Sequence, residues 1–127
     1  MNEAVLEHVN ITASDAKATA EMLCRLFDWQ VRWTGGAIDD GVSYHVGGAG
    51  SYVAVYSKGG REKLGDSYSA PGGLNHIGIV VDDLDATEQR VKEAGFEPHS
   101  HADYEPGKRF YFHAHDGIEI EVISYPT

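Results

Sequence analysis

Residues 109–123, RFYFHAHDGIEIEVI, decide the fold that we predict for this 127-residue chain. Apolar and polar side chains alternate on both sides of an Asp-Gly pair at positions 116 and 117, which is typical of a β-hairpin. Successive side chains of a strand point to opposite faces, so the apolar residues of the second arm should enter the core. Glu119 and Glu121 should then share the other face, which is either solvated or the wall of a cavity that contains a carboxylate.

Composition limits the classes of protein to which the chain can belong. A length of 127 residues with 42% apolar and 24% charged residues is typical of one globular domain. A net charge of −10 at pH 7 disfavours nucleic-acid binding. There is no apolar run of membrane-spanning length, no signal-peptide character at the start and only one cysteine, Cys24. We therefore expect a cytoplasmic protein without an intrachain disulfide that does not bind membranes.

Hydrophobic periodicity predicts a β-α-β-β-β module over residues 4–57. Residues 16–27 have helical spacing, and Ser14 and Asp15 before them are typical of a helix N-cap. Runs that alternate or are rich in β-branched and aromatic residues predict the strands of this module at residues 5–11, 29–34, 42–46 and 52–56.

A glycine-rich segment without periodicity, residues 58–73, separates this module from a second one and predicts a linker or lid. The second module covers residues 74–125. Its helix should span residues 84–94, with Asp82 and Asp83 at the start and Gly95 as the C-terminal cap. A loop is expected at residues 101–108, and the strands are expected at residues 74–81, at 96–99 and in the two arms of the 109–123 hairpin.

The two modules align as an internal repeat. A single β-α-β-β-β module leaves one sheet face uncovered, so two of them should curl around a common cavity. The predicted fold class is α+β: a single domain, residues 1–127, of two tandem β-α-β-β-β modules that form a curved, incomplete β-barrel. At nearly constant offset the repeat pairs His8 with His76, Asp15 with Asp83, Tyr44 with Tyr111, Gly50 with Gly117 and Ala54 with Glu121.

This duplicated pattern resembles the vicinal oxygen chelate superfamily, which includes glyoxalase I, bleomycin-resistance proteins, extradiol dioxygenases, methylmalonyl-CoA epimerases and fosfomycin-resistance transferases. The motifs are LEHV at residues 6–9, LNHIGIVVDDL at 74–84 and DGIEIEV at 116–122. The family places metal ligands at four equivalent positions, which here hold His8, Ala54, His76 and Glu121. The resemblance implies that two histidines and one carboxylate bind a divalent ion (Fe, Mn, Zn or Ni) and leave coordination positions open.

Ala54 departs from the glyoxalase I pattern, in which a glutamate or glutamine occupies that position. A glyoxalase-like or epimerase reaction would therefore lack its usual base. The remaining set is the pattern of extradiol dioxygenases and of fosfomycin-type transferases, whose Phe-Tyr-Phe run matches residues 110–112. The basic cluster that those transferases carry after the last strand is missing before Thr127, which disfavours fosfomycin as the substrate. Tyr111 is expected either to pack on the sheet or to act as a catalytic phenol beside a metal-bound substrate.

Two classes of function remain open. The first is a metal-dependent enzyme (a dioxygenase, a lyase or isomerase, or a thiol transferase) in which the ion activates a small oxygen-rich substrate. The second is a metal-free, bleomycin-resistance-like protein that sequesters an aromatic ligand, and a lactoylglutathione-lyase-like isomerase with an altered site is a further alternative. The resemblance also implies a homodimer, in which the two chains either lie side by side or exchange modules. In the exchanged form, His8 of one chain would join His76 and Glu121 of the other. The aromatic residues on which the binding protein would depend are Trp29, Trp33, Tyr52, Tyr56 and Tyr111.

The other polar residues of this region have weaker predicted roles. Arg109 is expected to hold a substrate carboxylate or to lie in solvent at a strand end. His113 could act as an acid or base near neutral pH, although its position near the turn favours exposure. The remaining histidines are expected mainly at the surface, with two of them on a loop that could reach the site; they are His45, His99, His101 and His115.

Overall fold

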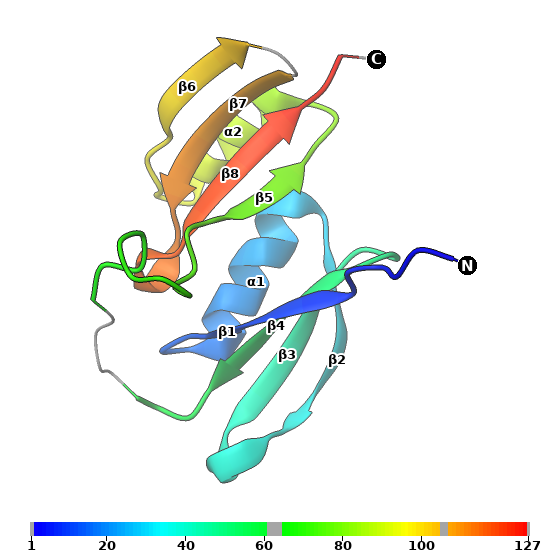
Figure 1. The fold of residues 1–127 in the computed structure, drawn as a ribbon, viewed down its shortest axis with the longest axis vertical. Helices are drawn as coiled ribbons and strands as arrows, with labels where there is room; N and C mark the ends of the chain where they lie inside the picture. The colour runs from blue at the N-terminus through cyan, green and yellow to red at the C-terminus, as the bar shows by residue number, and fades with distance from the viewer. Residues whose placement is uncertain (1, 61–64, 105–106, 127) are drawn as a thin grey trace. The chain divides into compact units, whose positions relative to one another are not determined.

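One four-stranded sheet and one α-helix make up each of the two units of the chain, Met1–Arg61 and Glu62–Thr127, called module one and module two below (Figure 1). The computed structural model describes residues 2–60, 65–104 and 107–126. Among these residues, neither helix has the length and apolar character that crossing a lipid bilayer requires. Part of the predicted linker, residues 61–64, lies outside the described residues.

In module one the strands lie in the order β1-β4-β3-β2, with β1 parallel to β4 and the other pairs antiparallel. The helix begins as predicted because the Asp15 carboxylate accepts a hydrogen bond from Ala18 N at 3.0 Å. It ends at Asp28, which adopts a left-handed conformation with φ of 56°. The elements are β1 (His8–Thr12), α1 (Ala16–Phe27), β2 (Gln30–Gly36), a 3₁₀ turn (Ile38–Asp40), β3 (Val42–Gly47) and β4 (Tyr52–Ser57).

Module two repeats this arrangement in the order β5-β8-β7-β6, and α2 covers one face of the sheet against β7 and β8 (Figure 1). Its helix is capped by Asp83, whose carboxylate accepts from Ala86 N at 3.0 Å, and Gly95 follows it with φ of 93°. The elements are β5 (Ile77–Val80), α2 (Leu84–Glu93), β6 (His99–Tyr104), β7 (Gly107–His113), a 3₁₀ turn (His115–Gly117) and β8 (Glu119–Ser124).

The hairpin of β7 and β8 provides most of the core of module two. Phe110, Phe112, Ile120 and Val122 are buried, as the alternation predicts, whereas Ile118 is only half-buried and precedes the strand. The opposite sheet face carries the polar side chains of the same two strands. The hairpin therefore has one apolar face toward α2 and one polar face on which a site can form.

The prediction for β6 is wrong. We expected a strand at residues 96–99 and a loop at residues 101–108, but β6 runs from His99 to Tyr104 and β7 starts at Gly107; residues 105 and 106 are outside the described residues. β6 lies at the edge of the sheet and has the sequence HSHADY. An edge strand needs fewer apolar side chains, so hydrophobic periodicity does not reveal it.

The internal repeat has the predicted register in the first and last strands. Asn10 pairs with Ala54 in module one, and Gly78 pairs with Glu121 in module two, so Ala54 and Glu121 occupy equivalent positions. The match of Tyr44 with Tyr111 is wrong, because His45 pairs with Ala54 whereas Tyr111 pairs with Glu121. The connection before β8 is one residue longer than the connection before β4, and this shifts the preceding strand by one position.

Candidate functional site

Three of the four predicted site residues lie together in module two. His76 directly precedes β5, Glu121 is in the middle of β8, and Tyr111 is on β7 opposite Glu121. His8 is the first residue of β1 in module one. His76, Tyr111 and Glu121 thus lie near one another in module two, and His8 belongs to module one.

The Glu121 carboxylate is held from two sides. Oε1 lies 3.0 Å from His76 Nε2, and Oε2 accepts a hydrogen bond from Arg109 Nη1 at 2.8 Å. The side chains of Glu121 and Arg109 are only 12% and 11% exposed. Gly78, beside Glu121 on β5, leaves space above the carboxylate: a Cβ there would come within 3.8 Å of Oε1. We expected Arg109 either to hold a substrate carboxylate or to lie in solvent at a strand end, whereas the structure pairs it with the predicted metal ligand Glu121.

The His76 ring is oriented by its other nitrogen. Nδ1 lies 2.7 Å from the side-chain amide of Asn75, which fixes the plane of the ring. Nε2 therefore faces the Glu121 carboxylate. Imidazole and carboxylate thus form the kind of donor pair that divalent ions bind.

Tyr111 stands between two histidines. Its ring is 5.6 Å from the ring of His76 in an edge-on arrangement and 6.2 Å from the ring of His99 in a stacked one. A cavity of about 220 Å³ lies beside the Tyr111 and His76 side chains and can hold part of a small-molecule ligand. The residues that line this cavity are Tyr68, Asn75, His76, Ser100, Tyr111 and Glu119.

A second group of possible metal ligands lies on the same face of the sheet. His99, His113 and Glu119 come from β6, β7 and β8, and their donor atoms all lie within 4.8 Å of one another. We expected His113 to be exposed, and its side chain is 56% exposed; His99 was expected at the surface or on a loop that could reach the site. The predicted hairpin already pairs His113 with Glu119, so the sequence could have indicated this contact. The position of His99 could not be predicted because the strand that carries it, β6, was not predicted correctly.

The polar face of module one carries aromatic rings in place of this ionic pair. Tyr52 stacks on His8 at 4.8 Å and on His45 at 4.6 Å, and Arg32 lies 4.7 Å above its ring. Partial burial and the nearby Glu7 carboxylate raise the pKa of the Tyr52 phenol. A hydrogen bond with His8 lowers the pKa of Glu7. His8 is thus oriented by Glu7, whose Oε1 is 2.9 Å from Nδ1.

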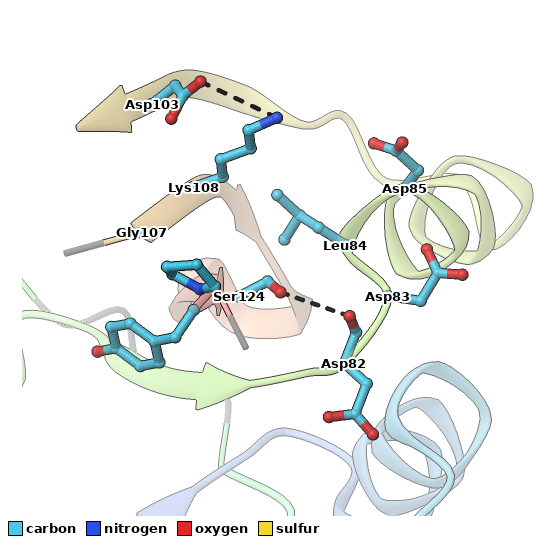
Figure 2. Close-up of a pocket in the computed structure, with 10 residues that line it drawn as sticks. Asp82, Asp83, Leu84, Asp85, Asp103, Gly107, Lys108 and Ser124 are labelled. Carbon is cyan, nitrogen blue, oxygen red and sulfur yellow. Dashed lines mark hydrogen bonds and ion pairs between the residues drawn. The ribbon is translucent and has the colours of Figure 1, made fainter. Parts of the chain in front are cut away.

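A larger cavity of about 660 Å³ lies elsewhere in module two, at the opposite end of β5 from His76. Figure 2 shows its aspartates around Leu84, with Lys108 directed toward Asp103 at 3.9 Å. None of the predicted site residues lines this cavity. Its lining residues are Asp82, Asp83, Leu84, Asp85, Asp103, Gly107, Lys108, Ser124, Tyr125 and Pro126.

Comparisons with solved structures agree with this fold. A glyoxylase/bleomycin resistance protein/dioxygenase domain from Frankia sp. EAN1pec is 22% identical, with a TM-score of 0.82 over 98% of this chain and 100% of that one. The fosfomycin resistance protein FosX from Listeria monocytogenes, complexed with Mn(II) and sulfate, is 18% identical, with a TM-score of 0.75 over 98% and 95%. FosX from Mesorhizobium loti is 22% identical, with a TM-score of 0.72 over 97% and 92%.

The comparison with curated proteins finds no match. The family model "Glyoxalase/Bleomycin resistance protein/Dioxygenase superfamily" matches residues 5–122, which include both modules and all four predicted site residues. The paired β-α-β-β-β modules and this match lead to one conclusion: the chain belongs to the glyoxalase/bleomycin resistance protein/dioxygenase superfamily.

Proposed function

We propose that the protein is a divalent-metal-dependent enzyme that acts on a small, oxygen-rich substrate, and that His8, His76 and Glu121 hold the ion. The observation that carries this proposal is the pair formed by His76 and Glu121. A nearly buried carboxylate faces an imidazole nitrogen at 3.0 Å, while the far side of each group is already occupied by Asn75 or Arg109. Such outer partners fix the orientation of metal ligands.

The residues of module two divide the remaining tasks. Arg109 holds one oxygen of Glu121 and leaves the other for the ion. Tyr111 lines the small cavity and can donate its phenol proton to a substrate oxygen there. When bound, the ion supplies Lewis acidity to the oxygens of a chelating substrate. Ala54 contributes no ligand and no base, which favours open coordination positions.

Manganese is the first ion to test, because the FosX structure from Listeria monocytogenes holds Mn(II). The reaction class remains among a dioxygenase, a lyase or isomerase, and a thiol transferase, and iron, zinc and nickel remain candidate ions. The proposal includes a homodimer, which the family resemblance favours. It also includes a cytoplasmic location, which the single cysteine favours.

Electron paramagnetic resonance of bound Mn²⁺ tests the proposal directly. We expect the wild type to bind Mn²⁺, and Glu121→Gln, His76→Ala and His8→Ala each to weaken binding by at least about 100-fold, since loss of an outer partner alone costs 10–100-fold. His101→Asn changes a histidine that pairs with Glu88 outside this site and should leave the affinity unchanged. The proposal fails if the wild type takes up no Mn²⁺, or if the ligand variants bind as well as His101→Asn.

A second experiment tests the substrate class. A mutant of FosX from Listeria monocytogenes has been crystallised with Mn(II) and 1S,2S-dihydroxypropylphosphonic acid. This oxygen-rich phosphonate is therefore a suitable probe. We expect it to change the resonance spectrum of the bound Mn²⁺ by replacing water on the ion, and a spectrum unaltered at millimolar probe would argue against a chelating phosphonate.

The aromatic face of module one favours a second candidate function, the metal-free sequestering of a planar ligand. Trp33 is 50% exposed and lies 4.8 Å from the His45 ring, which continues the stack through Tyr52 to His8. Aromatic ligands stack favourably on such surfaces. In protein treated with a chelator, bleomycin should quench tryptophan fluorescence, and Trp33→Leu should remove this quenching. Unquenched fluorescence in the wild type would exclude bleomycin as a ligand.

A further inference from the structure

We propose that His99, His113 and Glu119 form a second divalent-metal site, distinct from His76 and Glu121, which takes Zn²⁺, Ni²⁺ or Co²⁺ in preference to Mn²⁺. The three residues come from three neighbouring strands of one sheet, β6, β7 and β8. They share no metal ligand with the site of the proposed function, although Glu119 also lines the small cavity beside Tyr111. The inference does not rest on that function.

The donor atoms are already near the spacing that an ion requires. Glu119 Oε2 lies 3.4 Å from His99 Nε2 and 3.2 Å from His113 Nε2. Around a tetrahedral ion with bonds of about 2.0–2.1 Å, neighbouring donor atoms are about 3.3 Å apart. Both histidine-to-carboxylate separations therefore fit this spacing, and rotation of the side chains would bring the two imidazole nitrogens, which lie within 4.8 Å of each other, onto the same ion.

The backbone holds His99 in this orientation. The pairing of β6 with β7 shifts between His99 and Ala102, and Ser100 in this irregularity has φ of 55°, a left-handed conformation that is unusual for a residue other than glycine. Such irregularities change the direction of a side chain and are common at functional sites. The Ser100 hydroxyl lies 2.8 Å from His99 Nδ1, so the other nitrogen of the ring, Nε2, faces Glu119.

Within the described part of the chain, Glu119 has two imidazoles as its charge partners, whereas Glu121 on the same strand face has the Arg109 guanidinium. The Glu119 side chain is only 11% exposed, so its carboxylate loses most of its hydration and is stabilised by a nearby positive charge. His99 Nε2 is buried and makes no hydrogen bond to any described residue. An ion would neutralise the carboxylate and satisfy both rings.

The ligand types set the preferred metals. The two histidine rings stack with their centroids 5.0 Å apart and 17° between their planes, and the Nε2 atoms of both rings face the same oxygen of Glu119. Two imidazoles and a single carboxylate favour metals late in the first transition row, which bind nitrogen more tightly than Mn²⁺ does. The bound ion would also tie the edge strand β6 to β7 and β8, so metal should stabilise module two.

Calorimetric titration with ZnCl₂ tests the site in His76→Ala protein, from which the other candidate site has been removed. We expect this variant to bind one Zn²⁺, and the further change His113→Asn to weaken the binding by at least about 100-fold. His113 is 56% exposed, so His113→Asn should fold normally, and circular dichroism verifies this. Glu119→Gln, which keeps the shape of the side chain, should have the same effect.

His101→Asn in the same background is the matched control. His101 also lies on β6, but its Nε2 pairs with Glu88 at 2.8 Å, outside the cluster. It should leave the Zn²⁺ affinity unchanged, and the absorption bands of Co²⁺ in the visible should appear in His76→Ala and His76→Ala/His101→Asn but not in His76→Ala/His113→Asn. No Zn²⁺ uptake by His76→Ala, or equal uptake with and without His113, would overturn the proposal. The Mn²⁺ resonance experiment tests the proposed function separately, and Mn²⁺ binding that does not depend on His76 would contradict that function but not the second site.

Discussion

Modules one and two have the same backbone frame but different chemistry on the polar face of their sheets. The position of Ala54 in module one holds Glu121 in module two, and the position of Ser43 holds Arg109, because the strand registers are equivalent. Module two thus has an ion pair where module one has two small side chains. The two modules have equivalent backbone positions in their strands. The residue type at each position decides which module carries the ionic site.

The cores of the two modules differ in a complementary way. In module one a larger helix residue, Leu23, accompanies a smaller strand residue, Val46; at the equivalent positions module two has Val91 and Phe112. All four side chains are buried, with exposures of 3% or less. Because protein interiors are close-packed, volume removed from the helix must be replaced from the sheet. The sheet therefore dominates the core of module two.

Removal of the larger strand residue gives the largest expected effect. Phe112→Ala should lower the free energy of unfolding by about 3–5 kcal/mol, because it leaves a large cavity under α2. Val46→Ala at the equivalent place removes fewer atoms and should cost only about 2 kcal/mol. Urea denaturation followed by circular dichroism measures both. Equal losses would show that the two cores are not organised in opposite ways.

Breaking the ion pair is the next largest effect. Arg109→Met leaves the nearly buried Glu121 carboxylate without its cation and should destabilise the protein by about 3 kcal/mol. The double variant Arg109→Ser/Glu121→Ala has the residues of module one at both positions. Its loss of unfolding free energy should be smaller than the summed losses of Arg109→Ser alone and Glu121→Ala alone. The measurement is a double-mutant cycle of unfolding free energies, and additive single effects would show that the pair is not coupled.

The helix caps are a feature in which the modules should behave alike. Asp15 and Asp83 each accept a backbone hydrogen bond at 3.0 Å. Asp15→Ala and Asp83→Ala should therefore each cost about 1 kcal/mol, and the corresponding asparagine variants, which keep the cap, should cost little. Thermal unfolding compares the four proteins. A cap whose loss has no effect would identify a helix that depends on packing alone.

The smallest expected effect is on the reactivity of the Cys24 thiol, which lies on α1 at a position equivalent to Lys92 on α2. Cys24 of α1 is half-buried, and burial together with Glu21 raises the pKa of its thiol above the ordinary value of 9.0, whereas the equivalent residue of α2 is the exposed Lys92. Since only the thiolate reacts, alkylation by iodoacetamide should be slow at pH 8, with a midpoint above pH 9.0. Glu21→Gln should lower the midpoint. A wild-type midpoint at or below that of free cysteine would contradict the prediction.

Much of the fold follows from local patterns. The helical spacing and the Asp15 and Asp83 caps predicted both helices to within one residue at each end, because a helix is defined by contacts three and four residues apart. Alternation in residues 109–123 separated the apolar face from the polar face of the final hairpin. The repeat placed Ala54 opposite Glu121, which the strand registers confirm.

Strand and helix periods in the sequence were thus sufficient to predict the two modules and the polar face, because these depend on one element at a time. The candidate ligands His76 and Glu121 came from the resemblance to the family. Tertiary structure alone decided the pairing of Arg109 with Glu121, the edge strand β6 and the meeting of His99, His113 and Glu119. Those features depend on the register between strands and on the irregularity at Ser100. A shift of one residue between strands exchanges the faces on which side chains lie, and no local pattern records such a shift.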